Sequence, residues 1–103
     1  MVHVTVLYHP PADPAAFMAY YYDTHVPLAK RLPGLRAYTV SDGPILNADG
    51  TGAPYALVAD LTFDDAVAFT NAMASPEGRA VVAALANFAS GGATILTYDA
   101  RPV

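Results

Sequence analysis

The chain has 103 residues, which is the length of one domain spanning residues 1–103. Hydrophobic residues make up 54% of it and charged residues only 14%, against roughly 25% in average soluble domains, so we expect part of the apolar surface to meet a partner. The net charge is −4 and the five basic residues form no patch, which argues against nucleic acid as that partner.

The chain contains no cysteine, which excludes disulfides, thiolate metal sites and thiol catalysis. The first residues are not typical of a secretory signal, because no basic region precedes the apolar stretch and Pro10-Pro11 interrupts it. From Ala80 to Tyr98 no residue is charged, but Gly91-Gly92 divides this segment into a helix and a strand. We therefore expect no membrane span and a cytoplasmic location.

The first half of the chain predicts a strand, a helix and a second strand. Val2 to His9 is rich in β-branched residues and has a period of two, with Val2, Val4, Val6 and Tyr8 in one set and His3, Thr5, Leu7 and His9 in the other, which is typical of a strand. Asp13 followed by Pro14 predicts a helix start, an apolar stripe at helical spacing follows, and a Pro-Gly pair at positions 33 and 34 ends the helix. Leu35 to Asp42 predicts the second strand.

The second half begins with a turn-rich loop from Asp42 to Pro54, followed by a predicted strand from Tyr55 to Phe63. Asp64 is the expected cap of a second helix, which Ser75-Pro76 interrupts and restarts as far as about Phe88. A last strand is predicted from Ala93 to Asp99. The order βαββαβ predicts an α+β, ferredoxin-like fold with a four-stranded antiparallel sheet.

This architecture leaves one face of the sheet without helices. In the predicted third and fourth strands both sets of alternate residues are partly apolar. Such a face is expected to pack against the same face of a second copy, giving a two-fold homodimer and a dimeric α+β barrel. The alternative is a monomer with one amphipathic, solvated face.

The stretch YYYDTHVPLAKRLPGL, from Tyr20 to Leu35, is the most informative for function. Pro27 has no N–H to donate, so we expect the helix to kink or restart next to His25. Carbonyls freed at such a break favour a protonated imidazole, which predicts that His25 titrates near physiological pH. Tyr21 lies four residues earlier, on the same helical face as His25.

These positions give a set of candidate site residues. In a catalytic role, His25 acts as a general base or acid, and Tyr21 or Tyr8 positions a substrate oxygen. The predicted catalytic residues are His25 and Tyr21, and the predicted substrate-binding residues are Tyr8, Tyr22, Ile45 and Leu46, the last two from a loop that closes over the barrel or lies along the partner. The alternative is that His25 only satisfies unpaired carbonyls at the helix break.

No metal or nucleotide cofactor is expected. His3 and His9 share a strand face, but six residues of strand separate them by ~20 Å, too far for joint ligation. The loop segment Asn47 to Gly52 resembles a calcium loop, yet aligning its glycine places Ile45 and Ala56 where acidic ligands belong. The chain has no dinucleotide-binding fingerprint and no P-loop.

These residues together resemble the EthD family of small dimeric α+β barrels. The motifs are VTVLYHP (Val4 to Pro10), FMAYYYDTHVPLAKRLPGL (Phe17 to Leu35), PYALVADLTFDDAVAF (Pro54 to Phe69) and ILTYD (Ile95 to Asp99). The resemblance implies that His25 is the histidine of the family's H-x-P-L motif, with Tyr21 and Tyr22 as its helix neighbours. It also implies loosely defined activities, which in some fungal relatives are dehydration, decarboxylation or oxygenation of aromatic polyketides.

Three functions follow as hypotheses. The first is a barrel that binds a small apolar or aromatic molecule, with metal-free acid–base or oxidoreductase-type chemistry at His25. The second is a carrier or accessory protein for a hydrophobic catabolic or polyketide intermediate, which would bind it without catalysis. The third is a haem-linked oxygenase with His25 as the axial ligand, by analogy with other dimeric barrels.

Overall fold

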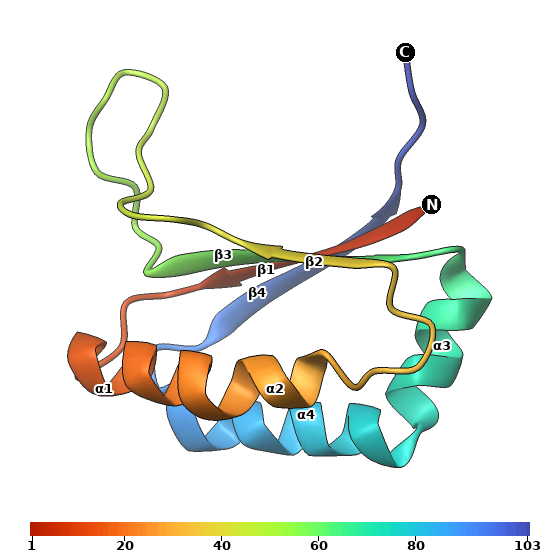
Figure 1. The fold of residues 1–103 in the computed structure, drawn as a ribbon. Helices are drawn as coiled ribbons and strands as arrows, with labels where there is room; N and C mark the ends of the chain where they lie inside the picture. The colour runs from red at the N-terminus through yellow and green to blue at the C-terminus, as the bar shows by residue number, and fades with distance from the viewer.

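The computed structural model describes residues 1–103 as one sheet with helices on one of its faces (Figure 1). The four strands are β1 (Val2–Tyr8), β2 (Ala37–Val40), β3 (Leu57–Phe63) and β4 (Ala93–Asp99). The helical segments are α1 (Pro14–Tyr20), the π-helical turn η1 (Tyr21–His25), α2 (Val26–Ala29), α3 (Ala66–Ala74) and α4 (Pro76–Phe88). None of the helices has the length and apolar character needed to cross a membrane.

The sheet has the strand order β2-β3-β1-β4, and all neighbouring strands are antiparallel. This arrangement confirms the predicted ferredoxin-like α+β fold. In Figure 1 the helices lie below the sheet, whereas the loop between β2 and β3 and the C-terminal end rise from the opposite side. We call the side without helices the open face.

The core forms between the helices and the alternate residues of the strands that face them. On β1 the residues of this set are buried (Val2, Val4, Val6 and Tyr8), and those between them are only partly covered. Tyr8, Leu57 and Phe63 from the sheet and Tyr21 from η1 are the largest fully buried side chains. The period-two pattern of β1 therefore separates the core from the open face.

Several predicted boundaries differ from the structure. The second strand, β2, is shorter than the predicted segment Leu35 to Asp42. The residues next to its two ends, Arg36 and Ser41, still donate backbone hydrogen bonds to β3. Asp65, not Asp64, caps α3, because its carboxylate accepts a hydrogen bond from the N–H of Ala68 at 2.8 Å. Asp64 instead accepts two hydrogen bonds from the Arg36 guanidinium.

The two other helix starts agree with the prediction. Asp13 accepts a hydrogen bond from the N–H of Ala16, and Ser75 accepts one from the N–H of Gly78, each at 3.1 Å. The Ser75-Pro76 step divides the second helical region into α3 and α4, and α4 ends at Phe88 as expected.

Replacing the cap of α3 tests this assignment. We expect Asp65→Ala to lower the free energy of unfolding by about 1 kcal/mol, because the N–H of Ala68 loses its side-chain acceptor. The matched control is Asp64→Ala, which removes the neighbouring carboxylate and only an exposed ion pair. Urea unfolding of both variants gives the comparison, and a larger loss in Asp64→Ala would contradict the assignment.

Candidate functional site

The helix break expected next to Pro27 takes the form of the π-helical turn η1. The N–H of Val26 donates to the carbonyl of Tyr21, five residues back, in place of the usual four. Pro27 itself lies at the start of α2, where its missing N–H is tolerated. Single π-helical turns inside α-helices are rare and occur frequently at functional sites.

This turn stacks His25 on Tyr21. Their ring centroids are 5.2 Å apart with an interplanar angle of 30°, and the imidazole also lies 4.9 Å from the ring of Phe88 on α4. Tyr21 is fully buried, and only 4% of His25 is exposed. The prediction that Tyr21 and His25 share one helical face is therefore confirmed, and that face points into the core.

His25 borders a cavity of about 110 Å³ between the helices and the sheet, which we call the His25 cavity. Seventeen residues line it and 16 of them are hydrophobic, so the imidazole lies in almost wholly apolar surroundings. Val82 of α4 and Ile95 of β4 are about half exposed and also line it. The cavity therefore opens to solvent between α4 and β4.

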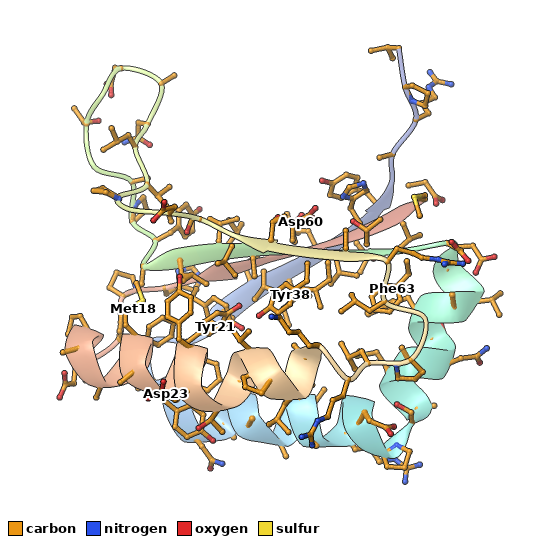
Figure 2. All side chains as sticks on the ribbon, in the orientation of Figure 1. Met18, Tyr21, Asp23, Tyr38, Asp60 and Phe63 are labelled. Atoms are coloured by element: carbon orange, nitrogen blue, oxygen red, sulfur yellow. The ribbon has the colours of Figure 1, made fainter.

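Three tyrosines border the same cavity. The hydroxyl groups of Tyr21 and Tyr38 lie 2.5 Å apart in a hydrogen bond, and Figure 2 shows both side chains between the helices and the sheet. Tyr8 packs with its ring edge-on to Tyr21, at a centroid distance of 5.5 Å. Of the predicted residues, the structure therefore brings Tyr8, Tyr21 and His25 together.

Tyr38 is the residue that the sequence analysis missed. It enters the cavity because β2 pairs with β3 in a register that places Tyr38 opposite Leu61, on the helix-covered face. The only available signal was the alternation of Tyr38 and Val40 with less apolar neighbours in a short strand. This alternation predicts a strand but does not determine which of its two faces packs against the helices.

The predicted titration of His25 near physiological pH is wrong. Burial lowers the pKa of His25 from its ordinary value of 6.5 to about 4, because the apolar surroundings disfavour the imidazolium. Its Nδ1 atom is buried and has no hydrogen-bond partner, so no carbonyl freed by the helix break reaches it. The imidazole is therefore neutral at neutral pH, and the structure gives no support to a role in satisfying unpaired carbonyls.

The tyrosines remain protonated in the same surroundings. Burial raises the pKa of Tyr8, Tyr21 and Tyr38, and the Tyr38 hydroxyl hydrogen-bonded to Tyr21 raises that of Tyr21 further. The cavity therefore combines a neutral imidazole with phenolic O–H groups. Chemically, this set can accept one proton and donate hydrogen bonds, but it presents no fixed charge.

Residues 9–92 match the EthD domain family. The chain belongs to the EthD family. An uncharacterized 11.0 kDa protein from the thcB-thcC intergenic region of Rhodococcus erythropolis is 42% identical over 103 residues, which is all of this chain and 98% of that protein. The crystal structure of an EthD family protein from Bacillus halodurans has a TM-score of 0.88 at 30% identity and covers 98% of this chain and 99% of that one. An EthD-like protein from Ralstonia eutropha has a TM-score of 0.73 at 25% identity, covering 95% and 89%.

More distant structures share the ferredoxin-like fold with this EthD protein. A dimeric ferredoxin-like protein from Jannaschia sp. has a TM-score of 0.70 at 17% identity, covering 96% of this chain and 98% of that one. SnoaB, a cofactor-independent oxygenase from Streptomyces nogalater, has a TM-score of 0.64 at 22% identity, covering 99% and 93%. At these identities the likeness extends to the fold alone.

The other predicted binding residues of this EthD protein lie outside the His25 cavity. Tyr22 contacts the ring of Tyr21 from outside and is 48% exposed. Ile45 and Leu46 belong to the loop between β2 and β3, which extends from the open face, and Leu46 is 58% exposed (Figure 1). The structure does not bring these three residues to the cavity, so their role in binding stays a prediction.

A second polar cluster lies on the open face of the sheet. Asp60 accepts hydrogen bonds from His3 Nδ1 at 2.8 Å and from the Thr5 hydroxyl at 3.0 Å, and Tyr98 stacks on the imidazole of His3 at 5.6 Å. Figure 2 shows Asp60 on the side of the sheet away from Tyr21 and Tyr38. No three His, Asp or Glu side chains in the chain come together as metal ligands would.

The low pKa of His25 predicts a stability that depends on pH. The unfolded imidazole takes up a proton near pH 6.5 and the folded one only near pH 4, so the folded state loses stability as the pH falls through this window. Between pH 7.5 and 4.5 the loss due to this group is on the order of 2–3 kcal/mol. Urea unfolding at both pH values measures it.

The matched comparison uses His25→Gln and His9→Gln. The first variant lacks the buried imidazole. Its free energy of unfolding should therefore fall less on acidification than that of the unmodified protein, and the difference should equal the loss assigned to His25. The second removes a histidine that does not line the cavity and controls for the loss of a histidine as such. Equal pH dependence in all three proteins would contradict the buried, neutral state of His25.

Proposed function

We propose that this EthD protein binds a small, mostly apolar, aromatic molecule in the His25 cavity, and that His25 transfers a proton to or from it without a metal or nucleotide cofactor. The observation that carries the proposal is the buried Nδ1 atom of His25, which has no hydrogen-bond partner at the wall of an apolar cavity. Buried polar atoms in native proteins are nearly always paired, and an unpaired one calls for a functional explanation. We infer that a ligand in the cavity, next to the same side chain, supplies a hydrogen-bond partner to the imidazole.

Burial leaves the imidazole of His25 unprotonated at neutral pH but also makes it a weaker base than an ordinary imidazole, so proton transfer depends on stabilisation of the ion pair that it forms. With a pKa of about 4, His25 holds no proton at neutral pH and can accept one from an O–H or an acidic C–H of a bound molecule. The imidazolium so formed is stabilised only while the ligand anion stays beside it, because the surroundings are apolar. Proton transfer and anion formation are therefore coupled within the cavity.

Two outcomes follow from such an anion. It can take the proton back at another atom, which is an isomerisation, or it can react with dioxygen as a co-substrate, which is an oxygenation. The second outcome is supported only at the level of the fold, which SnoaB, a cofactor-independent oxygenase, shares. Proton transfer at His25 is common to both.

A non-catalytic carrier is the second candidate. It is favoured by the composition of the cavity wall, where 16 of 17 residues are hydrophobic and no fixed charge stands ready to stabilise a transition state. The carrier hypothesis expects ligand affinity to survive the loss of the imidazole. The proposed catalyst expects proton transfer to disappear with it.

The haem hypothesis has less support. The cavity of about 110 Å³ is well below the roughly 300–1,000 Å³ of ordinary ligand pockets, and a haem is larger than most of the ligands they hold. Its lining contains no lysine or arginine that would pair with the haem carboxylates. The residues present therefore do not fit this group, and no step is assigned to it.

Proton transfer can be measured without knowing the natural reaction. We expect a panel of small phenols, cyclic ketones and lactones to include ligands that raise the melting temperature, since a hundredfold excess over Kd stabilises by about 2.7 kcal/mol. Each ligand found is then incubated with the protein in D2O, and NMR follows deuterium uptake at its acidic C–H positions. His25→Ala should abolish catalysed exchange, and His9→Ala should retain it.

The results separate the two candidates. Exchange that depends on His25 supports the catalyst. Binding without catalysed exchange, equal in the unmodified protein and His25→Ala, supports the carrier. If no ligand binds the unmodified protein, both candidates fail.

We also propose that the open face pairs with a second copy to form a homodimer. Leu96 and Tyr98 are about half exposed on this face, and the carboxylate of Asp60 already has two hydrogen-bond partners, so its burial leaves no unpaired oxygen. The loop between β2 and β3 and the C-terminal end rise on either side of the face (Figure 1). The dimeric ferredoxin-like relative gives further support.

Placing a charge on the open face tests the dimer. We expect analytical ultracentrifugation to give a dimer for the unmodified protein and a monomer for Leu96→Arg, since an unpaired guanidinium is costly to bury. Val67→Arg, on the exposed side of α3, is the matched control and should stay dimeric. A monomeric unmodified protein, or a dimeric Leu96→Arg, would contradict the proposal.

A further inference from the structure

We propose that the Tyr21–Tyr38 hydroxyl pair and His25 together bind the hydroxyl group of a one-ring phenol. The inference rests on the proposed function because it concerns the same cavity, and it names the class of ligand. Tyr21 comes from η1 and Tyr38 from β2, so the pair joins two elements that only the folded chain brings together.

The two hydroxyl groups leave one donor for a ligand. Each phenol side chain carries one O–H proton, and the hydrogen bond between Tyr21 and Tyr38 uses one of the two protons. The hydroxyl that accepts this bond keeps its own proton, which the 2.5 Å contact polarises. Because both side chains line the cavity, this proton can be donated to an oxygen atom there.

His25 supplies the complementary acceptor. The neutral imidazole has one N–H and one lone pair, and Nδ1 has no partner in the protein. The stacking of His25 on Tyr21, at 5.2 Å, keeps the imidazole next to one member of the hydroxyl pair. In this proposal the hydroxyl pair offers one donor and the imidazole one acceptor, and the Tyr8 hydroxyl borders the same cavity.

A phenolic hydroxyl matches this set better than the other groups that an apolar cavity admits. It accepts a hydrogen bond through its oxygen and donates one through its proton, so it satisfies both partners. A ketone or an ether oxygen only accepts, and a hydrocarbon does neither. The hydroxyl is also a group that can donate a hydrogen bond to the lone pair of a neutral imidazole.

The volume of the cavity limits the ligand to about one ring. At about 110 Å³ it is somewhat smaller than the roughly 150 Å³ engineered cavity that binds benzene. Any larger substituent must extend through the opening beside Val82 and Ile95. The walls select the ring by apolar contact, and the polar groups fix the position of the hydroxyl.

The competing explanation is that the hydroxyl pair is only a structural link between η1 and β2. Removing a structural link lowers stability but changes the affinities for phenol and toluene by the same factor. The two ligands have almost the same shape and differ in a hydroxyl or methyl group. Their relative affinity therefore reports on recognition of the hydroxyl, whatever happens to stability.

The experiment measures Kd for phenol and toluene by ligand-observed NMR titration. The proteins are the unmodified chain, Tyr38→Phe, Tyr21→Phe/Tyr38→Phe and Tyr55→Phe, the last being a control on a tyrosine outside the cavity. The ratio of the toluene Kd to the phenol Kd measures the preference for phenol. We expect this ratio to fall at least about tenfold in the double variant, because phenol loses one hydrogen bond to a buried group and toluene loses none. Tyr38→Phe should lower it by a smaller factor, and Tyr55→Phe should leave it unchanged.

A second series needs only the unmodified protein. Anisole keeps the oxygen acceptor of phenol but lacks its donor, so it should bind more weakly than phenol by about tenfold if His25 accepts the phenolic proton. A phenol preference that survives in the double variant, or equal affinities for phenol, anisole and toluene, would overturn this inference and leave the proposed binding of an apolar ring intact. If neither phenol nor toluene binds the unmodified protein, this inference fails together with the binding of a small aromatic ring.

Discussion

The packing of aromatic rings between the sheet and the helices holds the candidate site together. Tyr21 is in ring contact with Tyr8 of β1, Phe17 of α1 and Phe88 of α4, at centroid distances of 5.5, 6.1 and 5.9 Å. These contacts fix one helical face against the sheet and carry His25 into the core on the same face. The imidazole cannot move to solvent without breaking this packing. The ring contacts therefore keep His25 at the apolar wall of the cavity.

The same packing decides what His25 can do. An imidazole at a solvated helix break would exchange protons near neutral pH, whereas a buried one has a pKa of about 4 and stays neutral. In the proposed reaction, a ligand anion beside the imidazole would restore the stability of its charged form. The three tyrosines of the cavity are held protonated by burial and complement it as donors.

The sheet gives this small protein two chemically different faces. One set of alternate residues, with Val4, Val6 and Tyr8, closes the core and lines the His25 cavity. The other set, with His3 and Thr5, forms the polar cluster on the open face. A homodimer formed through the open face would leave the cavity between the helices and the sheet of each copy, so the proposed binding and the proposed assembly would use separate surfaces.

The sequence by itself determined the features that arise from short-range interactions along the chain. These include the order of strands and helices, the helix starts at Asp13 and Ser75, and the stacking of Tyr21 and His25, because spacing and capping act within a few residues. Only the tertiary structure decided that Tyr38 enters the cavity, since this depends on the register of β2 against β3. It also decided the low pKa of His25, because desolvation comes from residues distant in the chain that no local pattern brings together.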